Sequence, residues 1–132
     1  MGIKKRNELD PAYCWKLEDI YASDELWEAD FAEAGREADN FRKYSGRMTE
    51  GPDVLLEMMK AQEKMERRAE NVYVYANMRW HQDTANAVYQ AMAGRSAQLL
   101  TVTGDAQSFV EPEILLLTED TVRKYMEKCP EL

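Results

Sequence analysis

Apolar residues along this chain recur every three or four positions over three long stretches, which is the spacing of one face of an α-helix. Ser23 comes just before the first stretch as a candidate N-cap, and Asp24 and Glu25 suit the positive end of a helix dipole. Gly46 follows the stretch as a stop signal. The first predicted helix therefore lies between Ser23 and Gly46, and its apolar face consists of Trp27, Phe31, Ala34, Ala38 and Phe41.

The second stretch begins at Gly51-Pro52, where proline is tolerated in the first helical turn and Asp53 lies near the positive end of the dipole. The pattern continues to about Arg79, which predicts a helix of roughly 28 residues and about 42 Å. Its apolar face consists of Val54, Met58, Ala61, Met65, Ala69, Val72 and Ala76, and it is widened by Leu55, Met59 and Tyr73.

The third stretch follows a break near residue 83. Asp83 or Thr84 can cap the helix, and Pro112 is expected to close it. Its predicted inner face is Ala85, Val88, Met92, Ser96, Leu99, Val102, Ala106 and either Phe109 or Val110. Because the turn near residue 83 is short, we expect the second and third helices to form an antiparallel hairpin, with the first helix packed alongside.

Two shorter segments complete the predicted domain. A short fourth helix follows Thr118 and ends before Pro130. The apolar run from Glu113 to Leu117 is interpreted as a buried connector, because the sequence has no alternating strand pattern and no Asn-Gly or Asp-Gly hairpin turn. The predicted fold class is therefore all-α, an antiparallel bundle of three long helices plus a short C-terminal helix.

The start of the chain lacks a helical pattern. We expect residues 1–22 to form an irregular lead-in and residues 23–132 to form the helical domain. Four apolar side chains of the lead-in are expected to pin it onto the helical body, namely Trp15, Leu17, Ile20 and Tyr21.

The charge balance narrows the class of partner. The chain has 25 Asp plus Glu against 17 Lys plus Arg, a net charge of −8. A nucleic-acid backbone would be repelled, so no nucleic-acid partner is expected. No apolar stretch approaches the roughly 20 residues needed to cross a bilayer, and the charged start does not resemble a signal peptide, which favours a cytoplasmic protein without a membrane partner. Cys14 and Cys129 could form one bridge, but they show no metal-ligand spacing.

Residues suited to catalysis are sparse. His81 is the only histidine, whereas a zinc site needs three or four nitrogen, sulfur or oxygen ligands, so His81 is interpreted as a surface or capping residue. Glu63 and Arg67 are spaced as a helical ion pair, which is typical of a solvated face. Composition leaves paired-carboxylate glycosidase chemistry open, although no apolar setting marks a carboxyl with a raised pKa. We therefore predict no catalytic residue, metal ligand or cofactor in this chain.

One group of aromatic residues is harder to place inside a three-helix core. Tyr73, Tyr75, Trp80 and Tyr89 point to more than one side of their helices. Either a further layer covers some of them, or they line a surface that contacts another domain or a peptide. These four residues are the candidate contact surface.

Several strings of residues, taken together and in order, resemble a known family. The strings are Trp15-Lys-Leu-Glu-Asp-Ile-Tyr21, Tyr73-Val-Tyr-Ala-Asn-Met-Arg79, Asp83-Thr-Ala-Asn86, Tyr89-Gln90 and Ser108-Phe-Val-Glu-Pro-Glu-Ile-Leu115. The set is similar to the N-terminal region of oligoendopeptidase F, in the thimet-oligopeptidase-like family of zinc metallopeptidases. The resemblance spans residues 15–115.

The resemblance implies a parent enzyme about four times as long, a zinc-dependent hydrolase that cleaves short peptides in the cytoplasm. In that family a His-Glu-x-x-His helix and a further Glu hold zinc, and the inner Glu activates water. Here the one histidine is followed by Gln82, so no catalytic position transfers. The resemblance therefore implies a truncated N-terminal domain, a scaffold and channel wall that is inactive alone and whose missing partner is the catalytic domain.

A different class of function stays open beside this one. The chain could be a self-contained helical module that binds a partner helix or dimerises through its apolar faces. If partner domains are missing, apolar patches should be exposed or covered by a second copy, so self-association of the fragment is also expected.

Overall fold

Every regular element in the computed structural model, which describes residues 2–132, is helical. The predicted all-α class is therefore confirmed for the described residues. The α-helices are α1 (Asp24–Phe41), α2 (Pro52–Gln82), α3 (Ala87–Ala106), α4 (Val110–Leu115) and α5 (Glu119–Lys128). Short 3₁₀ turns lie at Arg6–Glu8, Pro11–Tyr13, Leu17–Asp19 and Arg42–Tyr44.

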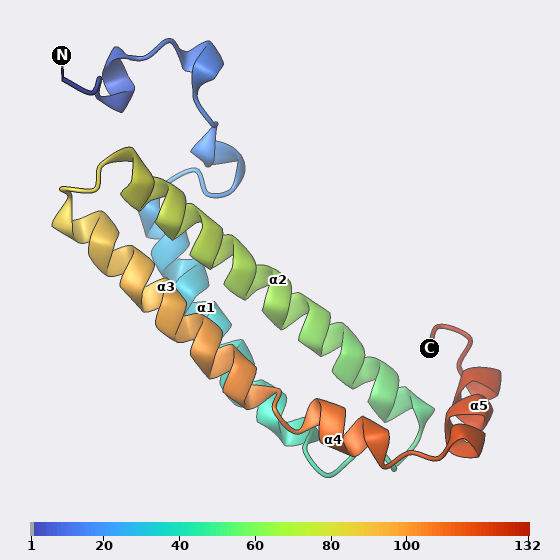
Figure 1. Ribbon diagram of the computed structural model, residues 1–132. Coiled ribbons are helices and arrows are strands. Elements are labelled where there is room, and N and C mark those ends of the chain that lie inside the picture. The colour runs from blue at the N-terminus through green and yellow to red at the C-terminus, as the bar shows by residue number, and fades with distance from the viewer. Residues whose placement is uncertain (1) are drawn as a thin grey trace.

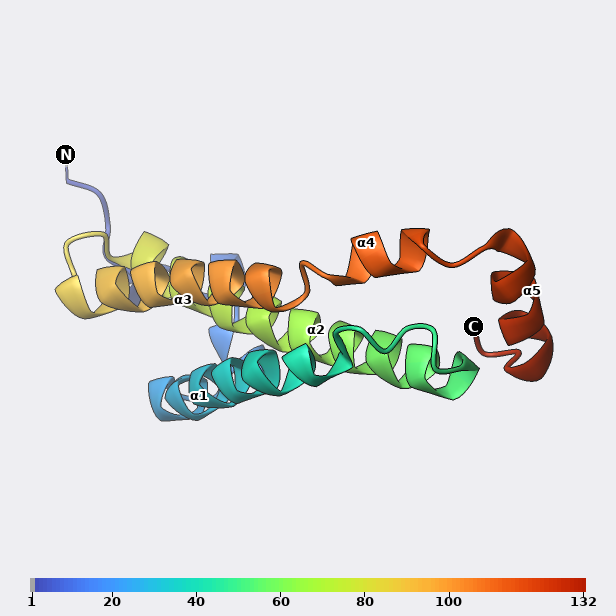
Figure 2. The ribbon, with the colours of Figure 1, turned by 90° about the horizontal axis from the view of Figure 1, so that it is seen from below.

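The three long helices lie side by side along one axis (Figures 1 and 2). α2 runs antiparallel to both α1 and α3, and each of the three contacts the other two. α4 continues beyond the end of α3, and α5 turns back against the start of α2. The lead-in and α5 consequently lie at opposite ends of the bundle.

The first two long helices begin where the sequence predicts. Ser23 is the N-cap of α1, where its hydroxyl accepts a hydrogen bond from the backbone N–H of Leu26 at 3.3 Å. α2 begins at Pro52 and runs three residues beyond Arg79. Gly46 lies in the turn after α1 with φ of 79°, a left-handed conformation that a side chain disfavours.

The start and inner face of α3 differ from the prediction. Neither Asp83 nor Thr84 caps the helix, because the Asn86 side chain accepts the backbone N–H groups of Val88 and Tyr89 at 2.9 and 3.3 Å. Val88, Val102 and Ala85 are exposed rather than internal, while Ala93 and Thr103 are buried. Met92, Ser96, Leu99 and Ala106 are buried as predicted, so the centre of the predicted face is confirmed and its edges are wrong.

The region after α3 also differs from the prediction. Pro112 lies in the first turn of the six-residue helix α4, where a proline does not break a helix, so it does not close α3. The predicted buried connector is only partly buried. Ile114 and Leu117 pack against the core, whereas Leu115 and Leu116 have 75% and 77% of their surface exposed. The short helix after Thr118 is present as α5, and the Thr118 hydroxyl caps it by accepting the N–H of Thr121 at 3.2 Å.

The lead-in packs onto the bundle through part of its predicted contacts. Leu17 is buried, and Ile20 and Tyr21 pack against the same core cluster. Trp15 does not help to pin the segment, because 79% of its surface is exposed. The regular elements within residues 2–22 are all 3₁₀ turns. The division of the chain into a lead-in and a helical domain at residue 22 stays a prediction.

The core extends along the full length of the bundle as two buried clusters. The cluster nearer the lead-in contains Trp27, Val72 and Met92, and the cluster nearer α4 contains Phe41, Met58 and Met65. Trp27 is fully buried, and its indole N–H donates to the backbone carbonyl of Val72 at 2.8 Å, so α1 and α2 are joined by a buried polar contact as well as by packing.

Two further observations concern the chain as a whole. Cys14 and Cys129 are both free. Among residues 2–132, no helix combines the length and the apolar character required for a transmembrane span.

Candidate functional site

Three of the four aromatic residues singled out in the sequence lie on two different sides of α2, and the fourth, Tyr89, lies on α3. Tyr75 is only 3% exposed and belongs to the core, and Tyr89 on α3 is partly buried against it. Tyr73 and Trp80 are seven residues apart, two helical turns, and so share the other side of α2. Tyr73 is exposed and Trp80 is partly buried. The predicted set is therefore two pairs, and its role in contacting another domain or a peptide stays a prediction.

The buried pair belongs to a polar cluster organised around Asp24, the first residue of α1. Its carboxylate accepts two hydrogen bonds from the Arg79 guanidinium, at 2.9 and 2.8 Å. The Tyr75 hydroxyl donates a third, at 2.7 Å. A two-pronged arginine–carboxylate pair has fixed geometry, so it holds the start of α1 against the end of α2.

Aromatic rings enclose this cluster. The Arg79 guanidinium lies 4.6 Å from the centre of the Tyr89 ring, which brings α3 into the same contact. Tyr21 of the lead-in meets Tyr75 edge to face, with ring centres 5.3 Å apart. We call Asp24, Tyr75, Arg79, Tyr89 and Tyr21 the Asp24 cluster. It joins all three long helices to the lead-in at one end of the bundle.

The electrostatics of the cluster favour a fixed charge state. Hydrogen bonding to Arg79 lowers the pKa of the Asp24 carboxyl, an effect that partial burial opposes. Burial, followed by the hydrogen bond to Asp24, raises the pKa of Tyr75. Both groups are thus held in the forms that they already have at neutral pH. A general acid or base needs a pKa moved toward neutrality, so the cluster suits a structural role.

Asp24 and Arg79 carry no signal in the sequence that pairs them. Asp24 fits the expected acidic first turn of α1, and Arg79 only marks the end of an apolar pattern. They are 55 positions apart, so their contact depends on how α1 and α2 pack. Neither residue could be placed in a site without the fold.

Trp80 is the other aromatic residue with an unusual setting. Its ring stacks on His81 with ring centres 5.5 Å apart. Its indole N–H is buried, and no residue between 2 and 132 accepts it. Tyr73 lies on the side of α2 that faces away from the core, and it is exposed to solvent. This side of α2 is the part of the predicted surface that is accessible to another molecule.

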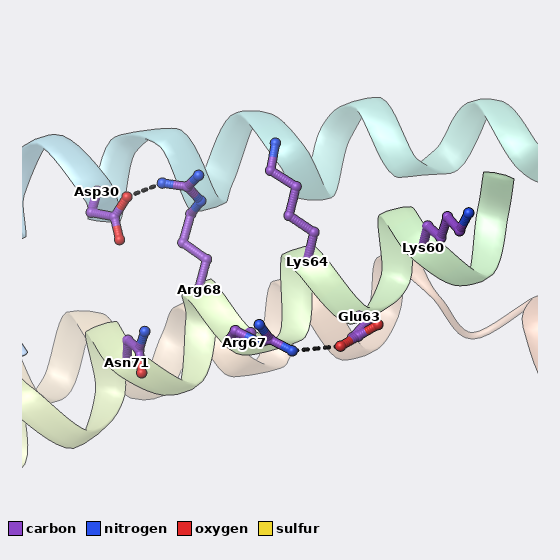
Figure 3. A pocket seen from close by; sticks show the side chains of 7 residues that line it. All are labelled: Asp30, Lys60, Glu63, Lys64, Arg67, Arg68 and Asn71. Carbon is purple, nitrogen blue, oxygen red and sulfur yellow. Dashed lines mark hydrogen bonds and ion pairs between the residues drawn. The ribbon is translucent and has the colours of Figure 1, made fainter.

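A charged depression of about 400 Å³ lies between α1 and α2 (Figure 3). Its basic side chains all come from α2, and Arg68 reaches across to Asp30 of α1. Each basic group has a carboxylate partner: Lys60 with Glu131, Lys64 with Glu37, Arg67 with Glu63, and Arg68 with Asp30 and Glu37. The predicted Glu63–Arg67 pair is thus present. The pairs of Lys64 and Arg68 with Glu37 and Asp30 form a seam of ion pairs between α2 and α1.

The described residues do not fit a zinc ion. His81, the single histidine, is exposed, and no group of three or more His, Cys, Asp or Glu side chains between residues 2 and 132 is arranged to hold a metal. The donor set that zinc requires in peptidases is therefore not present in this part of the molecule.

Comparison with known proteins gives a consistent relationship, although no family model matches the chain. It is 35% identical over 127 residues to group B oligopeptidase PepB of Streptococcus agalactiae, covering 96% of this chain and 21% of that protein. It is also 35% identical over 130 residues to oligopeptidase PepF of Bacillus subtilis, covering 98% of this chain and 19% of that protein.

The fold agrees with these sequence matches. The crystal structure of oligoendopeptidase-F from Enterococcus faecium superposes with a TM-score of 0.76 and 32% identity, over 83% of this chain and 22% of that one. The chain thus spans about a fifth of the length of the relatives that it matches. The resemblance predicted from the sequence is confirmed, and the chain belongs with the N-terminal helical region of the oligoendopeptidase F peptidases.

Proposed function

We propose that this chain is a non-catalytic scaffold of a zinc-dependent oligoendopeptidase, a helical domain that forms part of the wall of the channel where short peptides are hydrolysed. The observation that carries the proposal is the extent of the matches, which cover nearly all of this chain and about a fifth of each relative. The absence of a zinc-ligand set among residues 2–132 agrees with it.

In this proposal the zinc ion and the residues that activate water belong to a catalytic domain elsewhere in the polypeptide. No step of hydrolysis is assigned to residues of this chain. Its contribution is a stiff wall, in which the Asp24 cluster and the seam of ion pairs fix α1 against α2. Such a wall excludes folded proteins from a channel and leaves room for an extended peptide.

The accessible side of α2 is the part of the wall proposed to contact the catalytic domain or a peptide. Tyr73 and Trp80 lie there, and their rings offer apolar contact to either one. Tyr75 and Tyr89 lie on the opposite, core side of α2. There Tyr75 donates to Asp24 and Tyr89 contacts Arg79, which helps to hold α2 in place. The proposed setting is the cytoplasm. No nucleic-acid partner is proposed, because a net charge of −8 would repel a phosphate backbone.

The first experiment tests the non-catalytic character of the chain. We expect the purified protein, incubated with zinc and then dialysed, to retain no stoichiometric zinc, and to leave a quenched fluorogenic peptide intact. The zinc content of a His81→Ala variant serves as the matched control. Stoichiometric zinc in the original chain, lost in His81→Ala together with peptide hydrolysis, would overturn the proposal.

A second experiment tests the scaffold role directly. The matched region of the Bacillus subtilis oligopeptidase PepF is either deleted or replaced by this chain, and hydrolysis of a short peptide is measured. We expect deletion to abolish soluble activity and replacement to restore a substantial part of it, because the wall is needed to complete the channel. Full activity and unchanged peptide-length preference after deletion would contradict the scaffold role.

A further inference from the structure

A groove of about 450 Å³ lies between the lead-in and the last turns of α2. Its volume falls within the range of pockets that hold small ligands, roughly 300–1,000 Å³. Met78 and Gln82 of α2 line it from the bundle side, and Tyr13, Trp15 and Leu17 line it from the lead-in. None of the aromatic–charge contacts of the Asp24 cluster uses Tyr13 or Trp15, so this is a separate feature of the fold.

The groove exposes apolar side chains that a soluble protein normally covers. Tyr13 and Trp15 are 87% and 79% exposed, and Ile3 at the same groove is fully exposed. Large apolar residues gathered at one concave place indicate a surface that meets another molecule. Aromatic side chains are well suited to this, because they contribute large contact areas with few rotatable bonds.

The charged residues that line the groove have one sign. They are Lys4 and Arg6, and no Asp or Glu among residues 2–132 lines it, although the chain carries a net charge of −8. The single side-chain hydrogen bond of Arg6 goes to the backbone carbonyl of Trp15, which leaves further guanidinium N–H groups for another acceptor. The charged side chains that line the groove are therefore both basic, although the molecule as a whole is acidic.

A buried donor without an acceptor also lines the groove. The side-chain amide nitrogen of Gln82, the last residue of α2, is buried, and no described residue accepts its hydrogen bond. Leaving such a group unsatisfied is unfavourable, and groups of this kind in folded proteins call for an explanation. The nitrogen has almost no solvent-accessible surface, so an acceptor oxygen of a ligand would satisfy it once the side chain turns toward the groove.

From these observations we propose that the groove between the lead-in and the end of α2 binds an apolar peptide segment that carries a carboxylate. Tyr13, Trp15 and Met78 would contact its apolar side chains. Arg6 and Lys4 would receive the carboxylate, because their side chains carry only hydrogen-bond donors, and the Gln82 amide NH2 would donate a further bond. The proposal concerns this chain alone and does not depend on the proposed role in a peptidase.

The test uses the whole chain and two probes that differ in one group. Acetyl-Leu-Ala-Phe-Leu is prepared with a free C-terminal carboxylate and as the C-terminal amide, and each is titrated into the protein by calorimetry and by tryptophan fluorescence. We expect the acid to bind about tenfold more tightly than the amide, because a charge-assisted hydrogen bond is lost in the amide. Raised salt should reduce this preference.

Variants of the chain locate the binding. Gln82→Glu replaces the donor by an isosteric acceptor of negative charge, and we expect it to weaken binding of the acid about tenfold. Gln90→Glu makes the same chemical change at an exposed position of α3 and should leave binding unchanged. Trp15→Phe should remove most of the emission shift while calorimetry still detects the peptide, because Trp15 lines the groove whereas Trp27 is fully buried in the core and Trp80 does not line the groove.

Three results would overturn the proposal. The first is equal binding of acid and amide, which would leave only a nonspecific apolar surface. The second is unchanged affinity in Gln82→Glu, with circular dichroism showing the variant folded. The third is no binding of either probe at millimolar concentration. Zinc content and hydrolysis by the same samples report separately on the scaffold proposal, so the two can fail independently.

Discussion

At the scale of single residues, Asp24 holds together more of the molecule than its position at a helix start suggests. One carboxylate receives Arg79 and Tyr75 from α2, and Arg79 in turn covers Tyr89 of α3. Removing its charge leaves two partly buried donors with a poorer acceptor. The contact between helices therefore depends on a group that is itself about one third exposed.

We expect Asp24→Asn to lower the free energy of unfolding by about 1 kcal/mol, near the low end for charge-assisted bonds because solvent screens part of the interaction. Urea unfolding followed by circular dichroism measures the change. Glu25→Gln is the matched control, since the neighbouring carboxylate is exposed and forms no side-chain hydrogen bond or ion pair with another described residue. Equal losses in the two variants would contradict the role assigned to Asp24.

The same carboxylate predicts a pH dependence with a definite sign. Hydrogen bonding to Arg79 lowers the pKa of Asp24 below its ordinary value of 3.8 in the folded state, so the unfolded chain takes up the proton first. The stabilisation is complete above the ordinary value and is lost as the pH falls through the lowered pKa. We expect the stability difference between the original chain and Asp24→Asn to shrink between neutral pH and about pH 3. A difference that grows on acidification would refute this.

At the scale of elements, local chemistry determined which helix starts could be predicted. Ser23 and Pro52 are each the single strong start signal in their segments, and both helices begin beside them. Asp83, Thr84 and Asn86 lie within four residues, and all three types can cap a helix. Only the direction in which α3 must leave the turn to pack on α2 selects Asn86 among them.

We expect Asn86→Ala to cost about 1 kcal/mol of stability, because two backbone N–H groups at the start of α3 lose their acceptor. Thr84→Ala should change stability by less than about 0.5 kcal/mol, since Thr84 is exposed and caps nothing in this structure. Thermal or urea unfolding distinguishes the two. A larger loss in Thr84→Ala would restore the cap predicted from the sequence.

The other errors of the sequence-based prediction arise because α3 and the lead-in pack against the bundle on one side and face solvent on the other. α3 contacts α1 and α2 and has solvent on its remaining surface, so Val88 and Val102 stay exposed although they follow an apolar pattern. Trp15 resembles a core residue by type alone, yet it lies at the rim of a groove. Of the candidate site, the aromatic residues could be found from the sequence. Their polar partners could not, because long-range contacts depend on the fold.

At the scale of the whole molecule, the surface contains apolar positions that the bundle does not need. Leu115 is the last residue of α4, and Leu116 follows it. Both have about three quarters of their surface exposed, and α4 lies at the end of the bundle opposite the lead-in. Burying a leucine side chain contributes about 1.5–3 kcal/mol, so a second copy of the chain could cover these residues at a useful gain. We therefore predict that the chain by itself self-associates as its concentration rises.

Sedimentation equilibrium over a wide range of protein concentrations measures this association. The double variant Leu115→Ser with Leu116→Ser should weaken it at least tenfold, because about 1.4 kcal/mol of lost burial already corresponds to that factor. Val88→Ser, an exposed apolar position at the other end of α3, is the matched control and should leave association unchanged. A chain that stays monomeric at every concentration would show that the exposed leucines are tolerated in water. Association weakened equally by Val88→Ser would instead indicate nonspecific apolar association. Val88 lies at the start of α3 and the two leucines lie beyond its end, so one defined interface at α4 would not involve Val88.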